Sequence, residues 1–186
     1  MRKNFGPKSL TYPEPVFIIG TYDKEGKANA MNAAWGGIYD TNQIFLSFSS
    51  HKTTDNFKLT NCFTVSFGTR DTVLSCDYVG IVSGNKEPDK VAKAGLTAIK
   101  SEFVNAPYFK ELPVSLDCKI KELKEDQDGI KVIADILNVS ADESVIENGK
   151  IDAEKLSPLT YDPSQNKYFT ISEFVDYAFK SGLKLK

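Results

Sequence analysis

The chain has 186 residues, 41% hydrophobic and 26% charged, with a formal net charge of −2 and a pI near 5.5. This length suits one domain spanning residues 1–186, and the balanced charge gives no general attraction to nucleic acid or anionic membranes, so an anion site would have to be local. Residues 1–11 lack the apolar core of a signal peptide and no apolar run has the length of a membrane span, so we expect a cytoplasmic protein.

The first predicted element is a hairpin. Val16–Ile19 is an apolar run, the turn "DKEG" follows at 23–26, and a stretch of small residues comes next. Residues 44–49 and 62–67 alternate apolar and polar side chains, which predicts two further strands.

Helices are predicted between and after these strands. Residues 53–59 form a short helix for which Thr53 or Thr54 is the expected N-cap. Residues 71–95 lose the alternation of a strand, so we expect two helical pieces with a break near "SGNKEP".

The second half of the chain returns to strands. Residues 114–123 and 129–142 have strong strand patterns, and the "KEDQDG" link between them ends in Asp-Gly, a strong hairpin signal. A short helix is expected at 152–156 and a last strand at 167–171.

"SEFVDYAFKSG" predicts a closing helix with Ser172 as its N-cap and Gly182 near its end. Several strands with short helical insertions indicate a mainly β fold, either a β-barrel or a sandwich with peripheral helices.

The motifs of common catalytic and metal sites are absent from the sequence. It has no glycine-rich phosphate loop, a single histidine (His51), and three cysteines without a CxxC pair, so we expect no metal site and no catalytic side chain. A bound cofactor would then carry any chemistry. Cys76 is expected to be partly exposed, but no neighbouring cysteine supports a redox role for it.

"NAMNAAWGG", residues 29–37, is the first unusual segment. Small side chains let a flat ligand approach the backbone, and the amides of Asn29 and Asn32 can read its polar edge. The alternative is a tightly packed strand with Trp35 in the core, and the segment alone favours that alternative.

"SSHKTTDN", residues 49–56, is the second such segment. A phosphate binds to hydroxyl groups, a cation and the N–H groups of a helix start, and this stretch offers all three. Simple helix capping explains one threonine but not the whole cluster. "DYVGIVSGNKEPDK", residues 77–90, contains glycines that suit either a loop over a ligand or a break between helices.

Together these segments resemble the flavin reductase-like family of FMN-binding split barrels, and within it the flavoredoxin-type proteins. The resemblance covers nearly the whole chain, from "GPKSLTYPEPVFIIGTYDKEGKANAMNAAWGGI" through "HKTTDNFKLTNCFTVSF" and "DYVGIVSGNKEPDKVAKAGLT" to "ELPVSLDCKI" and "ADESVIENGKID". It implies a six-stranded antiparallel Greek-key split barrel with added helices, which forms a homodimer with FMN near the interface.

The resemblance also implies which residues contact FMN. The isoalloxazine ring would lie on Asn29, Ala30, Met31, Asn32, Ala33, Ala34 and Trp35, the phosphate and ribityl chain on Ser49, Ser50, Lys52, Thr53, Thr54 and Asn56, and a loop with Gly80, Ser83 and Gly84 would close over the flavin. Many relatives have arginine where Lys52 stands. Lysine keeps the charge but loses the bidentate geometry of arginine.

The implied function is an FMN-dependent oxidoreductase, most simply an NAD(P)H-dependent flavin reductase in which the flavin carries hydride or electrons. The alternatives are a non-enzymatic FMN-binding electron carrier with a redox partner protein, and a flavin-binding or storage protein without turnover.

Overall fold

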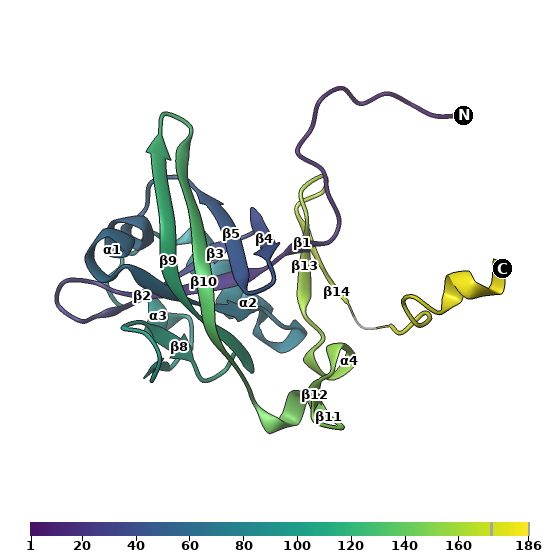
Figure 1. Cartoon of the computed structure of the whole chain (residues 1–186). Coiled ribbons are helices and arrows are strands. Elements are labelled where there is room, and N and C mark those ends of the chain that lie inside the picture. Colours follow the sequence, from purple (N-terminus) through teal and green to yellow (C-terminus); the bar gives the residue numbers. More distant parts are fainter. Residues whose placement is uncertain (172, 186) are drawn as a thin grey trace.

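The computed structural model describes residues 1–171 and 173–185, and its main feature is a seven-stranded antiparallel sheet (Figure 1). The strand order is β3-β2-β6-β9-β10-β5-β4. These strands are β2 (Phe17–Tyr22), β3 (Ala28–Ala33), β4 (Gly36–Asp40), β5 (Gln43–Phe48), β6 (Cys62–Phe67), β9 (Val114–Asp126) and β10 (Gly129–Ala141). The predicted mainly β fold is confirmed. The main sheet has one strand more than the six expected, because β4, which the sequence did not indicate, pairs with β5.

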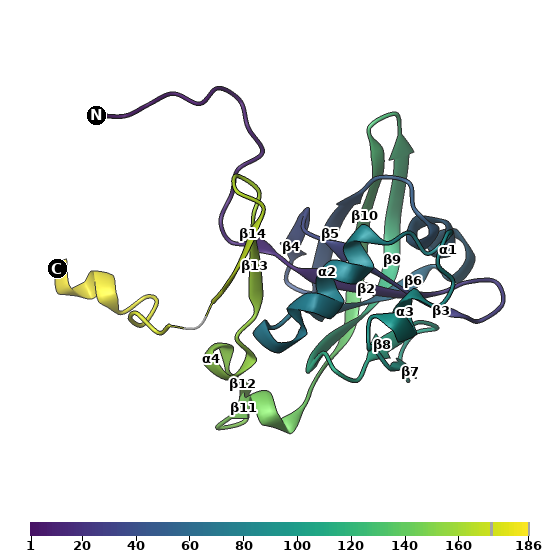
Figure 2. The same ribbon diagram turned by 180° about the vertical axis from the view of Figure 1, so that it is seen from behind.

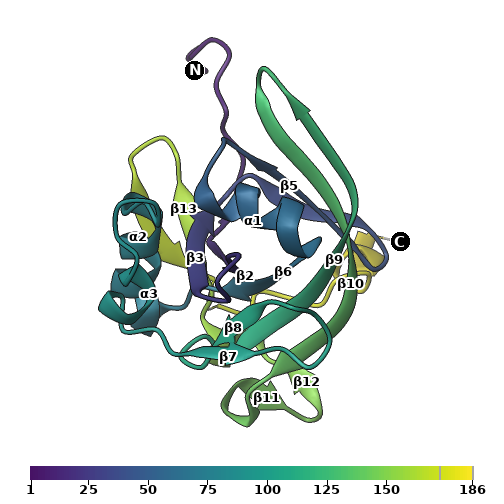
Figure 3. The same cartoon turned by 90° about the vertical axis from the view of Figure 1, so that its left-hand side faces the viewer.

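The sheet is rolled into a barrel. β3 and β4 stand at opposite ends of the strand order, yet only Ala34 and Trp35 separate them in the chain. Three Cα–Cα steps span no more than about 11 Å, so the two edges must lie close together where β3 ends and β4 begins. Figure 3 shows the strands curving around an interior, with α1 (Lys52–Thr60) across its near end.

β2 lies between two hydrophobic cores. Phe17 and Ile19 face the interior of the barrel, whereas Val16 and Ile18 belong to a second core that α2 (Val73–Ile81) covers. A strand that is buried on both faces has no polar side to expose. This explains why the predicted strand at Val16–Ile19 is a continuous apolar run.

Cys76 on α2 belongs to the second core and is fully buried, so the expectation that it is partly exposed is wrong. Burial raises the pKa of its thiol to about 11.

Helix α1 closes one end of the barrel through Phe57. The ring of Phe57 is 1% exposed and packs against Phe48 and Phe63, with ring centroids 5.4 and 5.0 Å apart. The predicted helix is therefore confirmed, and its apolar residue fixes where its N-terminus lies relative to β3 and β5.

Smaller elements surround the barrel, as Figure 2 shows from behind. The other helices are α3 (Lys90–Lys93), α4 (Ala153–Leu156) and the 3-10 turns η1 (Arg70–Thr72), η2 (Glu143–Val145) and η3 (Ser181–Leu185). The other strands are β1 (Glu14–Pro15), β7 (Ala98–Lys100), β8 (Pro107–Phe109), β11 (Ile146–Glu147), β12 (Lys150–Ile151), β13 (Leu159–Asp162) and β14 (Lys167–Thr170). The predicted break between two helical pieces is confirmed by the non-helical residues 82–89 that separate α2 from α3. Among the described residues, none of the helices combines the length and apolarity needed to cross a membrane.

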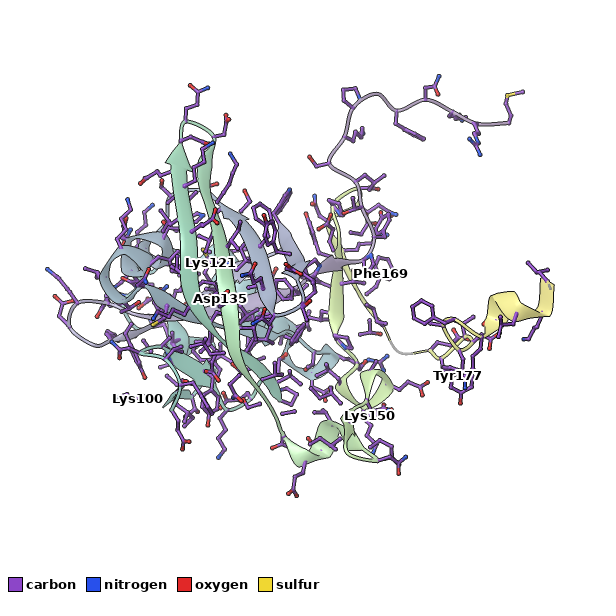
Figure 4. All side chains as sticks on the ribbon, in the orientation of Figure 1. Lys100, Lys121, Asp135, Lys150, Phe169 and Tyr177 are labelled. Carbon is purple, nitrogen blue, oxygen red and sulfur yellow. The ribbon has the colours of Figure 1, made fainter. Side chains whose placement is uncertain are left out.

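The predicted closing helix is wrong. Residues 173–180 are not helical, and only η3 forms beyond them, while the proposed N-cap Ser172 lies outside the described residues. Figure 4 shows this segment and the side chain of Tyr177 away from the barrel. Val175 and Phe179 are 88% and 100% exposed. The apolar periodicity therefore has no core to pack against within this chain, and packing supplies most of the stability of a short helix.

Candidate functional site

A cavity of about 620 Å³ lies between the end of β3, helix α2 and the β13–β14 hairpin. Figure 3 shows α2 and β13 on the side of the barrel where β3 runs. The residues that line the cavity are Met31, Asn32, Ala33, Ala34, Trp35, Ser47, Phe48, Ser49, His51, Asp77, Gly80, Ile81, Asp128, Tyr161, Asn166 and Tyr168. A volume of this size is typical of cofactor sites.

Helix α2 approaches β3 closely because Gly80 has no side chain. A Cβ at this position would lie 3.1 Å from the Cβ of Asn32, which is tighter than ordinary packing. The amide of Asn32 also donates to the carbonyl of Cys76 at 3.1 Å. The end of β3 and the adjoining face of α2 thus form two fixed walls of the cavity.

Most of the predicted ring-contact group lines this cavity. Residues 31–35 do so, whereas Asn29 and Ala30 are buried outside it. Trp35 is 54% exposed, so the alternative that placed its ring in the core is wrong. Contact of residues 29–35 with a flavin ring stays a prediction.

A second cluster joins β3 to the start of α1. The amide of Asn29 donates to Oγ1 of Thr53 at 2.7 Å, and both residues are buried. A Cβ on Gly84 would lie 2.3 Å from Oδ1 of Asn29 and 3.2 Å from Cδ of Lys52, so only glycine fits there. The structure therefore brings together four residues that the family resemblance assigned to three different parts of the FMN site.

The N-cap of α1 is His51, so the expectation that Thr53 or Thr54 is the N-cap is wrong. Thr54 instead occupies the third helical position. Its hydroxyl accepts the backbone N–H of His51 at 2.8 Å and donates to the carbonyl of His51 at 2.7 Å. This hydrogen bonding resembles a capping box, and among the described residues the backbone N–H groups of Lys52 and Thr53 have no acceptor.

Lys52 is already paired within the chain. Its Nζ lies 2.9 Å from Oδ2 of Asp23, with side chains 22% and 9% exposed. Burial raises the pKa of Asp23, but hydrogen bonds from Lys52 and from the backbone of Lys27 outweigh it and lower the pKa overall. A phosphate at the start of α1 would have to share Lys52 with this carboxylate.

A second lysine lies near Lys52. Lys90 is 4% exposed, and its Nζ donates to the carbonyls of Val79 and Val82, at 3.2 and 2.9 Å. Burial, and then the charge of Lys52, lower its pKa to about 8. This cation is solvated by the C-terminal carbonyls of α2 and makes the region positive.

The other predicted phosphate and loop residues differ in exposure. Ser49 lines the cavity, Ser50 and Ser83 are exposed, and Asn56 is buried with its amide donating to Oγ1 of Thr21 at 2.9 Å. A role of these side chains in FMN binding stays a prediction.

The sequence analysis missed the part of the cavity lining where α2 meets the β13–β14 hairpin. The hydroxyl of Tyr168 donates to Oδ1 of Asp77 at 2.8 Å, and that of Tyr161 donates to Oδ1 of Asn166 at 2.6 Å. Burial, reinforced by the hydrogen bond to Asp77, raises the pKa of Tyr168. The aromatic character of the last strand was visible in the sequence, but its pairing with a residue 91 positions earlier was not.

The cavity suits the ring of a flavin, and the start of α1 suits its phosphate. The small side chains of Ala33 and Ala34 leave room for a flat ring, and the described lining residues include no lysine or arginine. A phosphate therefore fits outside the cavity, where Lys52 and the free N–H groups of α1 lie. The donor set suits FMN in that orientation.

Comparisons with known proteins agree. A family model described as "Flavin reductase like domain" matches residues 9–171. A flavoredoxin of Desulfovibrio vulgaris (Miyazaki F) is 35% identical and covers 98% of this chain and 100% of its own, with a TM-score of 0.92. A flavoredoxin from Methanosarcina acetivorans is 27% identical, with full coverage of both chains and a TM-score of 0.89.

Among curated sequences, an uncharacterized protein of Bacillus subtilis (strain 168) is 24% identical over 96% of this chain and 94% of its own. The family and its flavoredoxin members support a flavin cofactor and a flavin-related oxidoreductase role. The match over residues 9–171, the split-barrel neighbours and the cavity at the end of β3 lead to one conclusion: the chain belongs to the flavin reductase-like family.

Proposed function

We propose that the chain binds FMN and is an oxidoreductase, most simply an NAD(P)H-dependent flavin reductase. The observation that carries the proposal is the cavity lined by residues 31–35, which ends near a helix start with a lysine beside it. When bound, the isoalloxazine ring supplies the hydride or electron transfer.

The side chains of the chain then act by positioning. The backbone and small side chains of residues 31–35 form the floor for the ring, and Asn32 holds α2 against that floor. Lys52 and the N–H groups of α1 bind the phosphate. Trp35 and the tyrosines of the hairpin limit access of water to the ring.

A non-enzymatic electron carrier is the second candidate. The two flavoredoxins are the neighbours with the higher identities reported above, which favours electron transfer with a redox partner protein. Both candidates need the same FMN site and differ in whether a nicotinamide nucleotide reacts with it.

One experiment separates them. Purified protein reconstituted with FMN is titrated anaerobically with NADH and with NADPH while flavin absorbance is recorded. Rapid bleaching by either nucleotide supports the reductase. Bleaching by dithionite but by neither nucleotide supports the carrier, and protein that takes up no FMN refutes both.

We also propose a homodimer. Exposed apolar side chains gather on the C-terminal segment, including Phe174, Val175 and Phe179, and a largely apolar groove of about 510 Å³ is lined by Ile38, Leu137 and other residues. Exposed apolar side chains that gather in this way are typical of interfaces between protein chains.

A further inference from the structure

The lining of the cavity carries negative charge. Among the described residues that line the cavity, the carboxylates are Asp77 and Asp128, and neither lysine nor arginine is present. Lys52, the cation closest to the proposed phosphate position, is not a lining residue. The ring end of the site thus differs in charge from the phosphate end.

Asp77 is fixed in this lining by its hydrogen bond with the hairpin. Its carboxylate is half-buried and accepts the hydroxyl proton of Tyr168 at 2.8 Å. The ring of Tyr161 lies beside that of Tyr168, with centroids 6.0 Å apart, and its own hydroxyl donates to Asn166. We call Asp77, Tyr161, Asn166 and Tyr168 the tyrosine–aspartate wall.

The wall offers acceptors and ring faces to a ligand, but few donors. Both phenol protons are engaged inside the wall, so the tyrosines present oxygen lone pairs and aromatic faces. Aromatic faces and carboxylates attract cations and N–H donors, and a carboxylate repels an anion in a partly desolvated site.

We propose that the tyrosine–aspartate wall is a second subsite of the cavity, which binds flat aromatic molecules that are neutral or cationic and rejects those that carry a carboxylate. The subsite deepens the proposed function, on which it rests, because a flavin on residues 31–35 would leave this other part of the lining for the second substrate. Asp77 is the residue that sets the charge selectivity.

The test uses three ligands of nearly equal shape: 1-methylnicotinamide (cationic), nicotinamide (neutral) and nicotinate (anionic) at pH 7.5. Trp35 is the only tryptophan and lines the cavity, so its fluorescence reports binding with and without FMN. We expect nicotinate to bind about tenfold more weakly than nicotinamide, as for charges about 6 Å apart at an effective dielectric constant of about 40. We expect 1-methylnicotinamide to bind at least as tightly as nicotinamide.

Asp77→Asn should reduce the discrimination to within about threefold, because the side chain keeps its size and loses its charge. Asp71→Asn is the matched control, since Asp71 is exposed and lies outside the cavity, and it should leave the ranking unchanged. Circular dichroism checks that each variant folds. The affinity order of the three ligands is measured first in the unmodified protein, so this part of the test does not depend on a variant.

Equal binding of nicotinate and nicotinamide, an unchanged ranking in folded Asp77→Asn, or no binding of the neutral and cationic ligands at millimolar concentration would overturn the proposal. A protein that ranks the three ligands as expected but takes up no FMN would support the subsite and refute the proposed function. The two failures are therefore distinguishable.

Discussion

Asp23→Asn should tighten FMN binding, because it removes the carboxylate that competes with the phosphate for Lys52. The carboxylate lies 2.9 Å from Nζ of Lys52. Its other oxygen, Oδ1, accepts the backbone N–H groups of Glu25 and Lys27 at 3.1 and 2.8 Å, which holds the turn between β2 and β3. Asparagine keeps an oxygen for that turn and loses only the charge, whereas alanine would lose both.

The size of the effect follows from Coulomb's law. A phosphate that contacts Lys52 from the far side of Asp23 would lie about 6 Å from the carboxylate, and at an effective dielectric constant of about 40 the repulsion is about 1.4 kcal/mol. Its removal should tighten FMN binding about tenfold. Riboflavin lacks the phosphate, so its affinity should not change.

The assay is a titration of flavin fluorescence with FMN and with riboflavin, in buffer free of phosphate. Lys52→Met is the reciprocal variant and should weaken FMN binding about tenfold, with no effect on riboflavin binding. The difference in FMN affinity between this variant and the unmodified protein should shrink as salt is added. Thr53→Ala is unsuitable, because it would leave the buried amide of Asn29 without its acceptor. Competition between Asp23 and the phosphate is refuted if Asp23→Asn leaves the affinity for FMN unchanged, or if it raises the affinity for riboflavin by the same factor.

Two further predictions concern the thiols and the C-terminal segment. Because burial holds the pKa of Cys76 at about 11, native protein should react with a thiol reagent at pH 8 only after unfolding. The free energy of unfolding should also fall as pH rises from about 9 to about 11, since over this range only the unfolded chain loses the thiol proton of Cys76. In urea titrations, Cys76→Val should therefore reduce the dependence of the unfolding free energy on pH. Fast labelling of Cys76 in the native state would contradict the burial. For the homodimer, light scattering should give twice the chain mass, and removal of residues 172–186 should weaken association; a full-length monomer at micromolar concentration would contradict the dimer.

Turns could be predicted from the sequence because a few neighbouring residues determine them. The Asp-Gly pair at 128–129 fixes the turn between β9 and β10, and the pairs Gly129–Asp126 and Ile130–Glu125 begin the ladder beside it. The turn at 23–26 was likewise predicted from turn residues, and the helix over 53–59 was predicted although its expected N-cap was wrong. The closing helix was predicted from periodicity alone, and periodicity does not say whether an apolar surface is there to receive the helix.

Only part of the candidate site could be predicted from the sequence, because the rest is formed by segments that are far apart in the chain. Residues 29–37 were unusual in the sequence, but the segment alone favoured a packed strand, and only the family resemblance assigned residues 29–35 to the flavin ring. The other part of the lining depends on where α2 and the β13–β14 hairpin meet, and no local pattern at Asp77 or Tyr168 encodes that pairing. His51 became interpretable only when the structure showed it to be the N-cap of α1.

In the proposed site, the distribution of charge favours one orientation of the flavin. A phosphate placed at the tyrosine–aspartate wall would meet the carboxylate of Asp77 and two hydroxyls whose protons are already donated. Placed at the start of α1, it meets Lys52, free backbone N–H groups, and the field of buried Lys90. The neutral ring then occupies the end without cations, where small side chains admit it. In the proposed site the carboxylates of Asp77 and Asp23 would act at different ends: Asp77 would exclude anions from the ring end, and Asp23 would weaken the binding of the phosphate by Lys52.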